Sequence, residues 1–159
     1  MNVQREPLLS FRLNMDPPKL TAQQKGTRAV GNKVHHYTKS EVRELQETFL
    51  RRLEWYRPAA PLTGTLALTV VWTYRWRETD LTKTGKKKAQ ISGCEWVPCP
   101  TRPDCSNIIK LFEDTLTVSG YFLDDGQVAN LTVWKGWGDD PGISVNIERL
   151  LFGQTTMQK

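Results

Sequence analysis

Carboxylates and a lysine gather in residues 102–128, which read RPDCSNIIKLFEDTLTVSGYFLDDGQV. Asp104 stands before a predicted helix, Lys110 lies within it, and Asp124 and Asp125 follow it. Mg²⁺ prefers carboxylate oxygens, and a bound metal makes water a better nucleophile and neutralises charge on a phosphate. An ammonium group such as that of Lys110 stabilises the same charge. These residue types therefore suit metal-assisted hydrolysis of a phosphodiester.

Each of these residues also has a purely structural interpretation. Asp104 could cap the helix or complement the charge of its N-terminus, and Lys110 could pair with Asp114 four residues later on the same face. Residues 124–126 could form no more than a turn. A helix of about thirteen residues is ~20 Å long. Asp104 and Asp125 therefore meet only if the chain returns beside the helix.

A basic segment precedes the acidic one. Between Arg75 and Lys88 there are six cations and two anions, and the whole chain carries a net charge of +5. Cations hold the phosphate backbone of nucleic acids, although a solvated lysine loop is the alternative. Trp76 and Trp96 flank this segment and could stack on unpaired bases. The predicted DNA-binding residues are Arg75, Arg77, Lys83, Lys86, Lys87 and Lys88.

Composition excludes several classes of protein. No apolar run approaches the ~20 residues that a membrane span needs, and the first six residues lack the apolar core of a secretion signal. We therefore expect a cytoplasmic protein with reduced thiols. The spacings between Cys94, Cys99 and Cys105 differ from the short cysteine pairs of zinc ribbons, so a zinc site completed by a distant histidine is a minor alternative. The adjacent His35 and His36 are expected on the surface.

Periodicity predicts the elements of the first half of the chain. Residues 10–15 alternate as a half-buried strand, and the polar residues 19–37 should form a loop or an irregular hairpin. Thr38 and Glu41 have capping-box spacing, so a helix should begin near Thr38. Apolar residues follow at helical spacing as far as Leu53, and Pro58 and Pro61 should stop the helix. Residues 66–76 form the clearest strand.

The second half begins with a long loop over residues 78–102, which by its length should be either functional or disordered. A helix should cover residues 106–118, with Gly120 as its C-cap. Strands should follow at 128–133 and 143–147, and a frayed tail should begin at about residue 153. This order predicts a single α+β domain over residues 1–159, with one mixed or antiparallel sheet and two main helices packed on it.

Two segments resemble the RusA-like Holliday junction resolvases, the crossover junction endodeoxyribonucleases. They are Pro103–Lys110, which reads PDCSNIIK, and Gly120–Val128, which reads GYFLDDGQV. The order and spacing of these residues make the resemblance specific. Residues 16–18, 21–25 and 140–143 resemble one phage and prophage branch of that family.

The resemblance implies a homodimer that cuts branched DNA such as four-way junctions, with one active site per subunit and a divalent metal, usually Mg²⁺, with Mn²⁺ as an alternative. Asp104 and Asp125 match the metal-binding aspartates, Asp124 matches the aspartate beside them, and Lys110 matches the essential lysine. Ser106 stands where the family has a further metal-binding aspartate. A non-catalytic protein that binds branched DNA on the same scaffold is therefore the alternative function, and an unrelated module with a structural acidic turn is a third.

Overall fold

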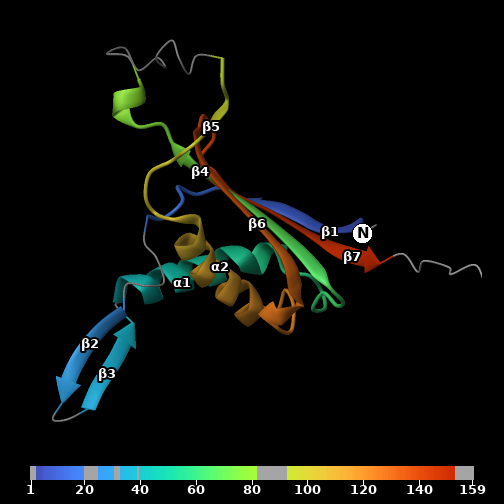
Figure 1. The fold of residues 1–159 in the computed structure, drawn as a ribbon, viewed down its shortest axis with the longest axis horizontal. Coiled ribbons are helices and arrows are strands. Elements are labelled where there is room, and N and C mark those ends of the chain that lie inside the picture. Colours follow the sequence, from blue (N-terminus) through green and yellow to red (C-terminus); the bar gives the residue numbers. More distant parts are fainter. Residues whose placement is uncertain (1–2, 20–24, 31–32, 39, 82–92, 153–159) are drawn as a thin grey trace, which may run out of the picture.

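A mixed five-stranded sheet with the order β1-β7-β4-β6-β5 forms the centre of the protein. The computed structural model describes residues 3–19, 25–30, 33–38, 40–81 and 93–152. The strands are β1 (Val3–Leu13), β4 (Leu66–Arg75), β5 (Trp96–Pro98), β6 (Val128–Gly138) and β7 (Gly142–Phe152). β4 and β6 run parallel, and the other neighbours are antiparallel. The last strand, β7, therefore lies between β1 and β4 (Figure 1).

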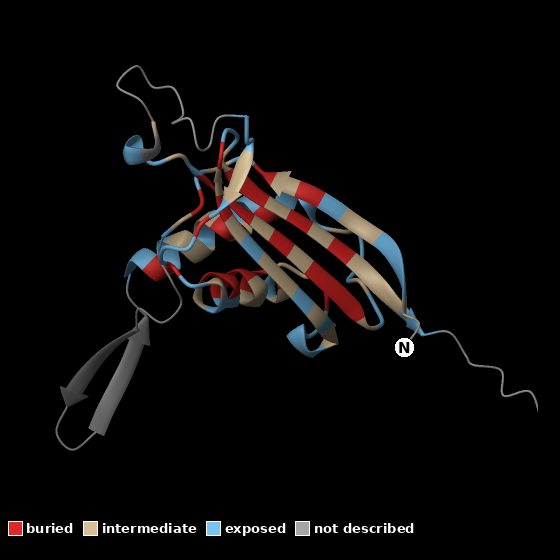
Figure 2. Cartoon of the chain, turned by 45° about the horizontal axis from the view of Figure 1, so that its top comes forward, coloured by how far each residue is buried: buried red, intermediate tan, exposed pale blue. Residues whose placement is uncertain are grey.

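Two helices, α1 (Ser40–Leu53) and α2 (Cys105–Val118), pack together against the sheet. The buried rings of Phe49, Trp72 and Phe112 meet edge to face, with centroids 5.1, 5.5 and 6.3 Å apart. Each such pair contributes about 0.5–1.5 kcal/mol beyond the burial of its area. Figure 2 shows the buried residues concentrated in the middle strands and along the helices. The α+β fold predicted from the sequence, with one mixed sheet and two helices, is confirmed.

The end of α2 is fixed by the predicted glycine. Gly120 has φ +78°, a conformation that costs glycine little. Its N–H donates to Thr117 O at 3.0 Å, and the N–H of Tyr121 donates to Leu116 O at 3.1 Å. This pair of bonds is a Schellman motif, which satisfies the last carbonyl groups of the helix. The buried Tyr121 then donates from its hydroxyl to Leu53 O at 2.8 Å, which ties the end of α2 to the end of α1.

Three strands are longer than alternation predicts. β6 and β7 extend beyond the predicted ranges 128–133 and 143–147. β1 begins at Val3, before the predicted range 10–15, and ends at Leu13, before the end of that range. The added part of β1 is largely exposed, so its sequence need not alternate, while pairing with β7 continues to Val3 opposite Phe152. Backbone pairing, which leaves little trace in side-chain type, sets these boundaries.

The stretch predicted as a loop, residues 78–102, contains the short helix η2 (Glu78–Asp80) and strand β5. β5 pairs with β6 over three residues, too few to show a period. Gly136 permits this pairing, because a Cβ there would lie 2.2 Å from Trp96 Cε2 and 2.5 Å from Val97 O. The side chain of Trp96 therefore packs across β6 at Gly136.

A hairpin of β2 (Lys25–Val30) and β3 (Lys33–Thr38) precedes α1. Of the two alternatives for residues 19–37, a loop or a hairpin, the described residues form the hairpin. Thr38 is the last residue of β3, so the predicted helix start is two residues early. No helix in the described part of the chain is long and apolar enough to cross a membrane.

Candidate active site and DNA-binding surface

Asp104 stands at the N-terminus of α2 and does not cap it with its side chain. Its carbonyl oxygen accepts from the backbone N–H groups of Asn107 and Ile108, both at 3.1 Å. The carboxylate makes no capping hydrogen bond, and Asn107 Nδ2 approaches its Oδ2 at 3.5 Å. A hydrogen-bonded cap is therefore the wrong interpretation of Asp104. Its negative charge still favours the helix N-terminus, and its exposed oxygens remain accessible to a cation.

A lysine that sequence patterns did not single out holds the segment before Asp104. Lys135 of β6 donates from Nζ to Pro103 O at 2.8 Å and also to Thr101 O. The peptide between Arg102 and Pro103 is cis. One ammonium group thus binds the carbonyl oxygens on both sides of Arg102 and restrains the chain where it enters α2.

A signal for Lys135 was present in the sequence. Lys135 lies on the same face of β6 as Val133 and Trp137, because each is two residues away from it. Both of these residues pack against the core. A lysine on the apolar side of a strand requires polar partners, because burying an unpaired ammonium group is costly.

The chain returns beside α2 and places Asp125 next to Lys110. Lys110 Nζ lies 2.9 Å from Asp114 Oδ1 and 3.7 Å from Asp125 Oδ2. The hydrogen bond and charge of Asp114 raise the pKa of Lys110, and Asp125 and Glu113 raise it further. Lys110 therefore stays positively charged. The three side chains in contact are about half exposed, so these pairs contribute little to stability.

Glu113 adds a fourth charged group to this cluster. It is half-buried, and burial raises the pKa of its carboxyl group. The neighbouring Asp125 raises this pKa further, while Lys110 lowers it. Ser106, Lys110 and Glu113 lie on one face of α2, since they are four and three residues apart. A carboxylate at position 106 would thus join the side of the helix that Asp125 faces.

The acidic pair after α2 is held by a shaped turn, the short helix η4 (Asp125–Gln127). Asp124 accepts at Oδ1 from Gly126 N at 2.6 Å, and Gln127 Oε1 accepts from the backbone N–H groups of Leu123 and Asp124. This is a capping box, so residues 124–126 form a structured turn, and the same turn places Asp125 beside Lys110.

Gln127 also anchors this turn to the rest of the protein. Its Nε2 donates to Leu62 O and Gly64 O, both at 3.2 Å. Gln127 belongs to the matched segment Gly120–Val128, in which the resemblance implied no role for it. Its four hydrogen bonds fix the position of Asp125.

The structure brings Asp125 to Lys110 and leaves Asp104 nearer the start of the helix. Lys110 is six residues after Asp104, about 9 Å along the helix axis. Among the residues that the structure describes, no three His, Cys, Asp or Glu side chains are grouped closely enough to hold a metal ion. Asp104, Asp124 and Asp125 therefore do not form a ready coordination shell in this conformation.

Comparison with protein families decides the identity of the fold. The family described as Endodeoxyribonuclease RusA matches residues 17–148, most of the chain. The chain belongs to the RusA family. Its members are divalent-metal-dependent endodeoxyribonucleases that bind branched DNA and resolve Holliday junctions. Among curated proteins, no sequence matches the chain. The resemblance to RusA nucleases is confirmed, and the phage branch remains a prediction.

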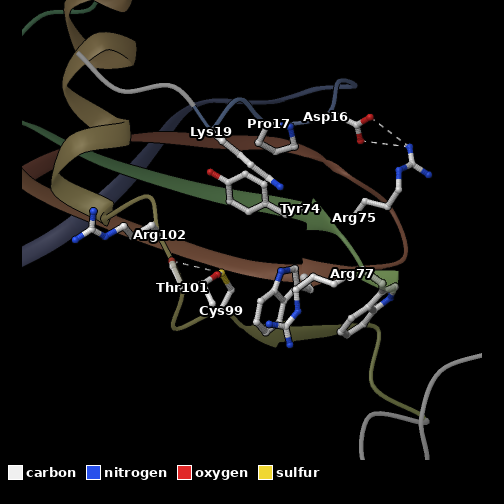
Figure 3. Close-up of a pocket in the computed structure, with 11 residues that line it drawn as sticks. Asp16, Pro17, Lys19, Tyr74, Arg75, Arg77, Cys99, Thr101 and Arg102 are labelled. Atoms are coloured by element: carbon white, nitrogen blue, oxygen red, sulfur yellow. Dashed lines mark hydrogen bonds and ion pairs between the residues drawn. The ribbon is translucent and has the colours of Figure 1, made fainter. Parts of the chain in front are cut away.

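Two of the six cations predicted to bind DNA lie in the described part of this RusA protein. Arg75 Nη2 lies 3.3 Å from Asp16 Oδ1, and the Arg77 guanidinium lies 4.0 Å from the centre of the Trp137 ring. Both line the pocket of Figure 3, which Thr101 and Arg102 of the segment before Asp104 also line. The other four, Lys83, Lys86, Lys87 and Lys88, lie outside the described residues.

The two tryptophans proposed for base stacking differ in their surroundings. Trp76 Nε1 donates to Asp139 Oδ1 at 2.7 Å, which fixes its indole beside the loop between β6 and β7. Trp96 packs over Gly136, and its Nε1 is buried without a hydrogen-bond partner among the described residues. Trp96 is therefore a sheet residue, and Trp137 is the aromatic ring beside the basic side chain of Arg77.

Proposed function

We propose that this RusA nuclease hydrolyses phosphodiester bonds at four-way junctions with Asp104 and Asp125 as the ligands of Mg²⁺, and that it acts as a homodimer in the cytoplasm. The observation that carries the proposal is the place of Asp125. The turn after α2 returns and sets this carboxylate beside Lys110, on the helix that begins at Asp104.

The donor set suits a hard divalent ion. Exposed carboxylates bind Mg²⁺ and Mn²⁺ through oxygen, and the ion keeps several waters. Asp124 uses Oδ1 for the turn, and its Oδ2 would serve as a third ligand. When bound, the metal polarises the phosphate and lowers the pKa of water at the site.

Lys110 has the charge and position to assist the same step. Its ammonium group is shared between Asp114 and Asp125. Its ammonium group would stabilise the charge that develops on a phosphate oxygen bound beside Asp125. Asp114 orients Lys110 from one helical turn away.

A second candidate function is a protein that binds junctions without cutting them. Ser106 favours it, because a hydroxyl replaces one of the family's carboxylates, and no metal cluster is preformed among the described residues. Both functions use the same basic surface and differ in whether strand cleavage follows binding.

The test is cleavage of a synthetic four-way junction and of linear duplex with Mg²⁺ or Mn²⁺. Asp104→Asn and Asp125→Asn should each abolish cleavage and leave junction binding in EDTA within about twofold, because the basic surface is retained. Glu47→Gln, which removes an exposed carboxylate from α1, is the matched control and should cleave normally.

Cleavage by either aspartate variant at near the wild-type rate would refute the assigned ligands. Junction binding by the wild type without cleavage in either metal would establish the second function instead.

A further inference from the structure

A cavity of about 390 Å³ opens between the end of β4, the end of β6 and the segment before α2. The residues that matter in its lining are Lys19, Tyr74, Arg75, Arg77, Arg102 and Trp137. Its volume lies within the range of sites that hold small organic ligands. Arg102, at one edge, is two residues before Asp104. The cavity therefore adjoins the start of the helix that carries the proposed active site.

The rim of the cavity is positively charged. Among the described residues, it contains four cations and one anion, Asp16, and this carboxylate lies against Arg75 at 3.3 and 3.5 Å. Lys19 and Arg102 are exposed at the rim. Such a rim attracts phosphate groups, and arginine can bind two phosphate oxygens at once.

The interior offers flat surfaces. Tyr74 is nearly buried, and its hydroxyl is already used in a bond to Pro18 O at 3.2 Å, so only its ring is presented. Figure 3 shows Tyr74 and Lys19 on one side of the cavity and Arg77 on the other. Arg77 lies over the ring of Trp137 at 4.0 Å, and a guanidinium group held in this way forms a second planar wall.

We propose that this cavity binds one unpaired nucleotide from the branch point of the junction, with its base between Tyr74 and the Arg77–Trp137 pair. Lys19 and Arg102 then bind the phosphates on either side. Aromatic rings and guanidinium planes accept the face of any base, so the site selects an unpaired nucleotide and not a sequence. This inference rests on the proposed function, because the position of Asp104 gives the cavity its place beside the cut.

A branched substrate suits this cavity better than a linear duplex. Taking a base out of a duplex costs free energy, and the cost is least where pairing or stacking is already broken, as at a branch point. Stacking on an aromatic platform raises affinity roughly tenfold or more per base. The exchange is therefore favourable at a junction and unfavourable within a linear duplex.

The test measures binding in EDTA, so that no strand is cut. Four junctions each carry one abasic nucleotide, in turn, at the positions that flank the branch point. Losing the stacked base should weaken wild-type binding about tenfold at one or more of these positions. Equal binding of all four abasic junctions and the intact junction would overturn the proposal without reference to any variant.

Protein variants then locate the effect. Trp137→Leu removes one planar wall, and Thr101→Trp fills the cavity from an exposed position and leaves the core intact. Either variant should bind intact and abasic junctions about equally, since stacking is worth roughly tenfold in affinity. Arg102→Gln should weaken the binding of the intact and the abasic junctions by the same factor. Arg51→Gln, at an exposed cation of α1 outside the cavity, is the control.

An abasic penalty that stays at the wild-type value in both folded cavity variants would place the unpaired base elsewhere. Failure of the proposed function looks different. If Asp104→Asn still cuts in Mg²⁺ while the abasic penalty depends on the cavity, the metal assignment is wrong and the nucleotide site stands.

Discussion

Lys135→Met tests whether the hydrogen bonds of Lys135 to the segment before Asp104 contribute to stability and to metal binding. The change keeps the aliphatic stem and removes the ammonium group that donates to Pro103 O and Thr101 O. Hydrogen bonds from a charged donor contribute about 1.5–3 kcal/mol each. Because Thr101 is exposed and water can replace one bond, we expect a total loss of about 2–3 kcal/mol. For a protein of this length, that lowers the unfolding midpoint by roughly 4–12 °C.

The functional effect should be distinct from the loss of stability. With the restraint removed, Asp104 samples more positions and binds a metal less well, so the Mg²⁺ concentration for half-maximal cleavage should rise. The rate at saturating Mg²⁺ should change less. The measurements are thermal unfolding without metal and a Mg²⁺ titration of junction cleavage well below the midpoint. Lys135→Arg, which keeps several donors, should restore most of both properties.

A normal Mg²⁺ dependence in a destabilised Lys135→Met protein would show that Lys135 serves only stability. An unchanged unfolding midpoint would refute the energies assigned to its two hydrogen bonds.

Three further changes examine the face of α2. Lys110→Ala should lower cleavage at least tenfold with an unfolding midpoint near that of the wild type, because its ion pairs are half exposed; a lower midpoint with normal cleavage per folded molecule would make Lys110 structural. Ser106→Asp should lower the Mg²⁺ concentration needed for cleavage, since it adds a carboxylate one turn before Lys110; superimposable titrations would put position 106 outside the metal site. Glu113→Gln should raise the unfolding midpoint near neutral pH, because a raised pKa means that the fold disfavours the charged carboxylate. This gain should disappear below about pH 4, where the carboxyl group is protonated in both states; the same gain at all pH values would contradict the pKa argument.

Much of the fold follows from side-chain patterns. The alternation in β4, the stripe of Ile108, Phe112 and Leu116 in α2, and Gly120 at its end predicted elements that the structure contains nearly to the residue. These features follow from local chemistry: burial sets the period, and only glycine takes φ +78° without strain. Strand ends and β5 could not be predicted, because backbone pairing between distant segments sets them.

The sequence predicted the residue types of the candidate site and only part of their arrangement. The motif supplied Asp104, Lys110 and Asp125, while the sequence left open whether the chain returns beside α2. The turn after α2 is anchored by Gln127, which binds backbone carbonyl groups more than sixty residues away. The segment before α2 is anchored by Lys135, which binds carbonyl oxygens about thirty residues away. Carbonyl groups are the same in every residue, so no sequence pattern identifies such partners.

The order of the strands in the sheet affects how the chain can fold while the ribosome is still synthesising it. β1 is synthesised before every other strand of the sheet, and its neighbour β7 is synthesised after all of them. Phe11 and Leu13 of β1 pair with residues of β7. At the usual rate of translation, of order ten seconds pass between the synthesis of β1 and the synthesis of β7. Pairing across such a span also makes folding slow. A nascent chain of this nuclease therefore presents an unpaired, partly apolar strand during most of its synthesis, and chaperones that bind extended apolar segments should meet it there.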